Sequence, residues 1–285
     1  MPAGCCFEIV VCDNASTDDT AGVVERISLP NFPISYVFEP VPGQCRAYNR
    51  AIAASRGEIL LFTDDDVIVP GNWLTGMAEP ILSGEADQVV GGIRTALHLI
   101  KPWMTTIHLG WFADTTNTPR DARGLITGAN MAVSRRVFEK VPRFDEETGP
   151  GALGHASDTL FALQLDTVGF RKSIRLDVEV EHHFDEERLT RAAFERQANR
   201  RGEFGAYLDY HWLHLPARFR FAKFVRAWLR LNAARVLRYR EWRDHPAVPA
   251  WELPLLDGYY HSLHVLKTFG APRKYEERGL VKLQP

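Results

Sequence analysis

The chain has 285 residues, of which 45% are hydrophobic and 25% are charged. This composition excludes an intrinsically disordered chain, and the length suits one large α/β domain with an extension or two small domains. The formal net charge of −2 gives no general argument for nucleic-acid binding, although acidic residues gather early and basic residues late. We find no signal-peptide pattern and no apolar run long enough to span a bilayer.

The four cysteines, Cys5, Cys6, Cys12 and Cys45, all lie in the first sixth of the chain, and none has a CxxC spacing. We expect reduced thiols in a cytoplasmic protein, with redox or zinc chemistry as the alternative.

The first 70 residues alternate between strand and helix signals with short links. Strands are expected at residues 7–12, 34–38 and 59–62, and helices at residues 18–27 and 46–55. This order predicts an α/β domain with a parallel sheet and helices on its faces. Ligands in such sheets bind beyond the carboxyl ends of the strands.

The chain changes character near residue 186. Before it we expect helices at 73–82, 135–140 and 156–168, strands at 88–94 and 173–180, and a loop or short helices at 97–123. After it, residues 186–210, 218–242 and 253–269 have helical patterns. The sequence therefore predicts two domains, an α/β domain over 1–185 and a helical extension over 186–285.

Three adjacent carboxylates, Asp64, Asp65 and Asp66, directly follow the apolar strand at 59–62. Adjacent anions repel one another, and a hard cation with a preference for oxygen ligands relieves that repulsion. The stretch therefore indicates a Mg²⁺ or Mn²⁺ site that holds a phosphorylated ligand. The alternative is a solvated acidic loop or a helix start at Asp66.

The predicted helix over 218–242 mixes aromatic and basic residues at helical spacing. Such a helix can lie on a membrane surface, at the inner face for a cytoplasmic protein. The alternative, slightly favoured, is an ordinary amphipathic helix docked on the domain with solvated arginines.

With these elements in order, the chain resembles family-2 glycosyltransferases of the GT-A fold. The resemblance rests on "EIVVCDNASTDDT" (8–20), "GQCRAYNRAIAASRGEILLFTDDDV" (43–67), "GANMAVSRRVFEKVPRF" (128–144) and residues 157–169. It implies a Rossmann-like, mostly parallel sheet with flanking helices, followed by the helical extension.

The resemblance also implies a donor site. Asp13 would contact the nucleobase, or else form an Asx turn, and Arg46 would lie near the diphosphate, or else be a solvated helix residue. Asp64 would lie near the ribose. The metal ligands would be Asp65, as the best candidate of this DxD-type motif, with Asp66 and His182.

On the acceptor side, the resemblance makes Asp158 the general base, with a helix N-cap as the alternative role. Gly128 and Asn130 would form the floor of the acceptor pocket. Ser157 and Leu160 depart from the family pattern, which has acids at both places. The family's usual first strand is also missing, which predicts unpaired strand edges in the sheet.

These features predict a metal-dependent, inverting glycosyltransferase that uses a UDP- or GDP-sugar to build a polysaccharide, a lipid-linked glycan or a glycosylated metabolite. The alternative is an inactive fragment or pseudoenzyme that serves as a nucleotide-sugar-binding or partner subunit. A nucleotidyltransferase is disfavoured, because the chain lacks a Gly-rich N-terminal loop with Arg or Lys.

Overall fold

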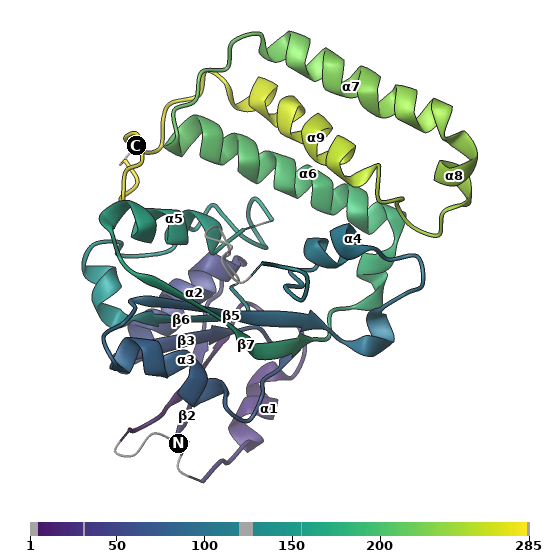
Figure 1. Ribbon diagram of the computed structural model, residues 1–285. Coiled ribbons are helices and arrows are strands. Elements are labelled where there is room, and N and C mark those ends of the chain that lie inside the picture. Colours follow the sequence, from purple (N-terminus) through teal and green to yellow (C-terminus); the bar gives the residue numbers. More distant parts are fainter. Residues whose placement is uncertain (1–4, 31, 120–127, 155, 284–285) are drawn as a thin grey trace.

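The computed structural model describes residues 5–30, 32–119, 128–154 and 156–283 (Figure 1). Part of the 97–123 stretch, for which the sequence predicts irregular structure, lies outside these ranges. The sheets form one part of the molecule. Helices α4 (Thr106–Trp111) and α5 (Thr159–Val168) lie between the sheets and a helical layer. That layer consists of α6 (Arg191–Tyr207), α7 (Arg220–Leu237) and α9 (Leu253–Thr268). Within the described residues, no helix is both long enough and apolar enough to cross a membrane.

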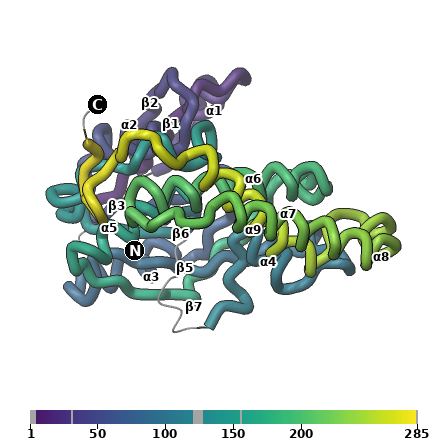
Figure 2. Tube along the Cα trace, turned by 90° about the horizontal axis from the view of Figure 1, so that it is seen from above, coloured from purple at the N-terminus to yellow at the C-terminus, as the bar shows by residue number. Residues whose placement is uncertain are grey.

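A small sheet opens the chain. β1 (Ile9–Asp13) and β2 (Ile34–Phe38) pair in parallel, with Ile9 opposite Ile34. The crossover between them carries α1 (Thr20–Arg26), as a parallel pair requires. Viewed from above, β1, β2 and α1 project to one side of the larger sheet (Figure 2).

The larger sheet has five strands in the order β3-β6-β5-β7-β4. Its strands are β3 (Ile59–Thr63), β4 (Val67–Ile68), β5 (Gln88–Thr95), β6 (Asn130–Ser134) and β7 (Lys172–His182). β5 and β7 pair in parallel, whereas β6 runs antiparallel to both β3 and β5, and β4 antiparallel to β7. The α/β class is confirmed, and the sheet is mixed where the β-α-β-α-β pattern predicts only parallel neighbours.

The two sheets do not join. Within the described residues, β1 pairs only with β2 and β3 pairs only with β6, so both strands keep an unpaired edge. The Glu8 carboxylate nevertheless accepts hydrogen bonds from the backbone amides of Arg56 and Gly57, which ties the start of β1 to the start of β3. β1 and β3 are therefore edge strands within the described residues.

β3 is covered on both faces, as its continuous apolar run predicts. Leu60 and Phe62 pack with α2 (Gln44–Ala54) and α5 (Thr159–Val168). Ile59 and Leu61 pack with α3 (Trp73–Leu82) on the opposite face. This burial fixes the direction of the strand and places the Asp64–Asp66 turn at its carboxyl end.

The C-terminal region consists of helices, as predicted. They are η3 (Glu186–Leu189), α6 (Arg191–Tyr207), the π-helical turn Leu208–Trp212, α7 (Arg220–Leu237), α8 (Tyr239–Asp244) and α9 (Leu253–Thr268). A core of Phe194, Leu231 and Leu253 joins them to α4 (Thr106–Trp111). The last residues return to the α/β part, where Lys282 and Tyr275 bind the buried Asp145 carboxylate at 2.8 and 2.9 Å.

Candidate functional site

Asp66 and His182 lie together because β4 pairs with the end of β7. Val67 is opposite His182 in the register, and the Asp66 Oδ2 atom lies 3.3 Å from His182 Nε2. His182 Nδ1 lies 3.2 Å from the backbone oxygen of Phe112, which accepts only, so Nδ1 carries the proton. The other ring nitrogen, Nε2, faces Asp66 Oδ2, so it can donate a hydrogen bond to this carboxylate or share a cation with it.

This pair fits a divalent cation. The Asp66 Oδ1 atom is buried and has no hydrogen-bond partner among the described residues, and such orphaned oxygens require an explanation. The hydrogen bond from His182 lowers the pKa of Asp66 below its usual range, so the carboxylate is charged at neutral pH. Carboxylate oxygen and imidazole nitrogen both suit Mn²⁺, and carboxylate oxygen suits Mg²⁺.

The protein offers the cation only part of a coordination shell. No group of three or more His, Cys, Asp or Glu side chains in the described part of the chain could hold a metal by itself. Mg²⁺ sites commonly use one or two carboxylates and complete their shell with water and substrate phosphate. Asp65, the ligand that the sequence favours, is exposed in the turn. The geometry therefore favours Asp66 and His182, and the role of Asp65 stays a prediction.

Asp64 forms the inner wall of this site. Its Oδ1 atom accepts hydrogen bonds from Gln44 Nε2 at 3.3 Å and from the Tyr48 hydroxyl at 3.2 Å. Burial, and next the charge of Asp66, raise the pKa of Asp64 to about 6. Ser157 donates to Gln44 Oε1 at 2.7 Å, so this departure from the family pattern helps to position Asp64 through Gln44.

Asp158 lies on the other side of the same site, at the start of α5. It occupies the N-cap position without a side-chain cap hydrogen bond to the backbone, and its Oδ1 atom accepts from the Thr159 hydroxyl at 3.3 Å. Burial raises the pKa of Asp158, which suits a group that takes up a proton, and its charge acts on Asp64 and Tyr48. Gly128 lies next to the Asp158 carboxylate, since a Cβ atom added at Gly128 would be 3.2 Å from Asp158 Oδ2.

Asp13 lies at the end of β1 and already has partners for both oxygens. Oδ1 accepts from the backbone amide of Ser16 at 2.9 Å, and Oδ2 accepts from the Tyr36 hydroxyl at 2.7 Å. This is the Asx-turn arrangement that the sequence allows as the alternative. The nucleobase contact stays a prediction, since a carboxylate can accept further hydrogen bonds.

Two other predicted site residues, Arg46 and Asn130, have partners within the protein, and the contact of Arg46 with a diphosphate stays a prediction. Arg46 forms an ion pair with Glu146 at 2.6 Å. Asn130 is fully buried, accepts from Trp73 Nε1 at 2.9 Å and donates to the backbone oxygens of Gly92 and Val178. These contacts hold the Asn130 amide within the protein, and its place in the floor of an acceptor pocket stays a prediction.

The sequence analysis missed Arg188, in η3. Its guanidinium carbon lies 5.2 Å from the Phe184 ring centroid and 5.7 Å from that of Phe112, and it has no ion-pair partner among the described residues. The Arg188 side chain is exposed, and the charges of Asp66 and Asp64 act on its guanidinium. An unpaired guanidinium beside two carboxylates can bind an anionic group. Only its place six residues after His182 could have singled it out in the sequence.

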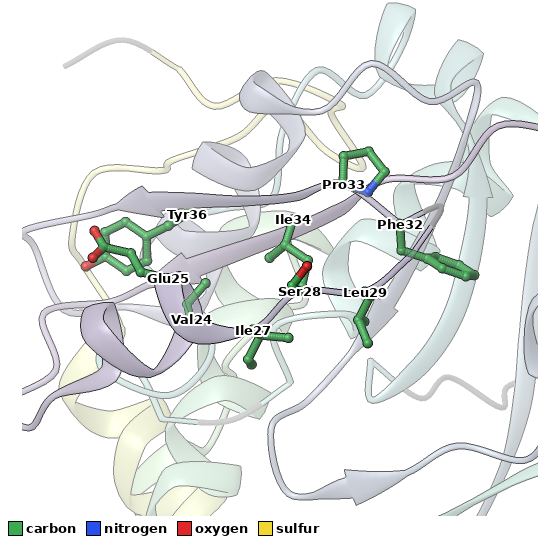
Figure 3. A pocket seen from close by; sticks show the side chains of 9 residues that line it. All are labelled: Val24, Glu25, Ile27, Ser28, Leu29, Phe32, Pro33, Ile34 and Tyr36. Atoms are coloured by element: carbon green, nitrogen blue, oxygen red, sulfur yellow. The ribbon is translucent and has the colours of Figure 1, made fainter.

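A separate cavity of about 310 Å³ lies between α1 and β2 (Figure 3). Ile27, Leu29 and Phe32 line it, and Tyr36 lies at one end. Tyr36, which lines the cavity, also donates a hydrogen bond to Asp13 at the end of β1. The cavity therefore lies beside the small sheet, and no residue of the Asp64–Asp66 turn lines it.

Comparisons with known proteins agree with this geometry. A family model described as "Glycosyl transferase family 2" matches residues 5–142. Glucosyl-3-phosphoglycerate synthase of Mycolicibacterium paratuberculosis is 40% identical over 96 residues, which is 29% of this chain and 26% of that protein. The succinoglycan biosynthesis protein ExoM of Rhizobium meliloti is 33% identical over 107 residues, which is 36% of this chain and 34% of that protein.

Among solved structures, the mannosyltransferase PcManGT from Pyrobaculum calidifontis, in complex with GDP-Man and Mn²⁺, superposes with a TM-score of 0.52 at 20% identity. The match covers 90% of this chain and 60% of that one. At this identity the likeness shows the fold, and it confirms the GT-A architecture with helices at the C-terminal end. The matched segments span only about a quarter to a third of the two sequence relatives.

Proposed function

The chain belongs to glycosyltransferase family 2, and from this premise we propose that it moves a sugar from a nucleotide-diphosphate sugar to a hydroxyl acceptor. The observation that carries the proposal is the convergence of Asp64, Asp66, His182 and Asp158. The charges of Asp66, His182 and Asp158 all act on the Asp64 carboxyl, although these residues come from three separate segments.

The donor end of the site would be built around the diphosphate. Asp66 and His182 would hold Mg²⁺ or Mn²⁺, with Asp65 as a further candidate ligand. When bound, the cation supplies positive charge that stabilises the departing nucleoside diphosphate. Arg188 would donate to the same phosphate oxygens, since a guanidinium matches phosphate geometry. Asp64 would lie near the ribose and Asp13 near a uracil or guanine base.

Asp158 would act on the acceptor in an inverting transfer. Its carboxylate accepts the proton of the acceptor hydroxyl while that oxygen attacks the anomeric carbon, and the bond from that carbon to the diphosphate oxygen breaks. A raised carboxyl pKa makes Asp158 a better proton acceptor. A Cβ atom at Gly128 would lie 3.2 Å from Asp158 Oδ2, so a side chain there would hinder the approach of an acceptor hydroxyl.

The acceptor would belong to a polysaccharide, a lipid-linked glycan or a metabolite. The relatives named glucosyl-3-phosphoglycerate synthase support testing a glucosyl donor and a phosphorylated acceptor first. The unpaired edges of β1 and β3 favour the other candidate, a non-catalytic fragment or pseudoenzyme that only binds the donor or a partner. We also propose a cytoplasmic location, since all four cysteines are free thiols, with peripheral contact at the inner face of a membrane.

The test is release of nucleoside diphosphate from UDP-glucose and GDP-mannose, measured with Mn²⁺ and after chelation. The proposal predicts metal-dependent release that increases with an acceptor, and inversion at the anomeric carbon by proton NMR. Asp66→Asn should remove the release, and Asp166→Asn, a matched change on the far end of α5, should not. Release that persists in Asp66→Asn would contradict the assignment.

A further inference from the structure

Helix α7 combines exposed apolar side chains with a one-sided charge. Residues 210–240 contain eight lysines and arginines and no aspartate or glutamate. The helix lies at the outer side of the helical layer, with α9 between it and α6 (Figure 1). α7 contributes none of the residues assigned above to the donor or acceptor site.

The contacts with α9 define the inner face of α7. The Phe224 ring lies 5.8 Å from the Tyr259 ring, Leu231 is buried in the core, and Arg235 Nε donates to the buried Glu252 at 2.6 Å. The remaining faces of α7 are therefore available to solvent or to a partner.

A band of large apolar residues runs along those remaining faces. Phe221, Trp228, Leu229 and Val236 are exposed by 69%, 47%, 53% and 75%. At about 100° per residue, they fall within one sector beside the inner face. Phe219, just before the helix, is 81% exposed and has a left-handed φ of 55°, a conformation that costs a bulky residue energy. We call this band the α7 surface.

Basic side chains border the α7 surface. Lys223, Arg226 and Arg230 are exposed, fall together on the edge away from Phe221 and Trp228, and have no ion-pair partner among the described residues. At the N-terminal end of α7, Arg220 and Lys223 also line a cavity of about 130 Å³ together with Leu215 and the His261–Asp209 pair. Exposed aliphatic and aromatic groups with a cationic border match the interface of an anionic bilayer.

We infer that the α7 surface docks this protein on an anionic phospholipid bilayer, with the apolar band inserted at the headgroup level and the basic border against lipid phosphates. This deepens the peripheral contact proposed above by assigning its residues. A second copy of the chain is a poorer occupant, because a symmetric contact would bring the two cationic borders together. Simple solvated arginines do not account for Phe219 and Phe221, which ordinary helix packing would bury.

The test is cosedimentation with vesicles of phosphatidylcholine alone or mixed with phosphatidylglycerol. We expect binding only to the mixed vesicles and its loss at high salt, since screening weakens the attraction. Arg226→Glu with Arg230→Glu should lower the partition coefficient by at least about 25-fold, from about fivefold per cationic residue. Phe219→Ser with Phe221→Ser should reduce binding without changing its salt dependence.

Matched controls are Lys140→Glu with Arg143→Glu, which make the same charge change on exposed residues of the α/β part, and Leu82→Ser at the end of α3. Both should bind vesicles like the wild type, and circular dichroism should show every variant folded. Calorimetric UDP and GDP binding should be unchanged in the α7 variants, so a failed donor site is distinguished from a failed membrane contact.

Three results would overturn the inference. The first is absence of binding to the anionic vesicles by the folded protein. The second is equal loss of binding in the control variants. The third is a wild-type dimer in light scattering that the Phe219→Ser, Phe221→Ser variant converts to a monomer, because the occupant would then be a second copy.

Discussion

Replacing Asp158 with asparagine removes the proposed base while it keeps a residue that suits the start of α5. The carboxylate has no ion-pair partner among the described residues, so its loss breaks no salt bridge. A positioned general base contributes about 10²- to 10⁴-fold to a rate, which is about 3–5 kcal/mol in the barrier. We therefore expect kcat to fall by that factor, with donor affinity changed by less than about threefold.

The assay is initial-rate release of nucleoside diphosphate as a function of pH. Because burial raises the pKa of Asp158, wild-type activity should fall with decreasing pH already above the ordinary carboxyl range, where the base becomes protonated. The asparagine variant should lack this limb, and Asp166→Asn should retain it. A kcat within about tenfold of the wild type, or an unchanged acidic limb in Asp158→Asn, would refute the assignment.

Three further changes separate binding, folding and the C-terminal attachment. Arg188→Ala should weaken UDP or GDP binding by about 10- to 100-fold in calorimetry, since one charge-assisted hydrogen bond contributes about 1.5–3 kcal/mol; unchanged affinity would exclude contact with the diphosphate. Asn130→Ala should lower the free energy of unfolding by about 2–4 kcal/mol, because Trp73 and two buried backbone oxygens lose their hydrogen bonds; wild-type stability in urea would show that the amide is dispensable. Burial alone would raise the pKa of Asp145, but the hydrogen bond from Lys282 holds this pKa below its usual value. The ionised carboxylate therefore stabilises the folded protein at pH values above the unfolded-state pKa, and this stabilisation is lost as the pH falls through the folded-state pKa. Asp145→Asn should cost about 2 kcal/mol at neutral pH, and the difference from the wild type should shrink in acid; a constant difference would contradict this reasoning.

The helices and strands could be read from the sequence because their signals are local. The strand at 34–38 and the helix at 73–82 have the predicted bounds, and β3 is buried on both faces as its apolar run indicates. Strand order is not local. The antiparallel insertion of β6 between β3 and β5 depends on long-range pairing, which residue patterns alone do not encode.

The site residues show the same difference between local sequence signals and long-range contacts. Asp66 and His182 were predicted together, and the β4–β7 register brings them into contact. The role of Asn130 cannot be decided from its motif, which looks the same whether the amide faces an acceptor or bonds only to Trp73 and two backbone oxygens. Arg188 was not predicted because its guanidinium lies over the stacked Phe112 and Phe184 rings, a contact that the sequence does not show. The two rings come from segments 72 residues apart.

The most direct test of the donor site is calorimetric titration of the purified chain with UDP and GDP, with and without Mn²⁺, beside Asp66→Ala and Asp65→Ala. The account predicts Mn²⁺-dependent binding of one nucleotide, abolished in Asp66→Ala and weakened less in the exposed Asp65→Ala. Failure of a folded sample to bind either nucleotide would contradict the account and favour a non-catalytic partner subunit.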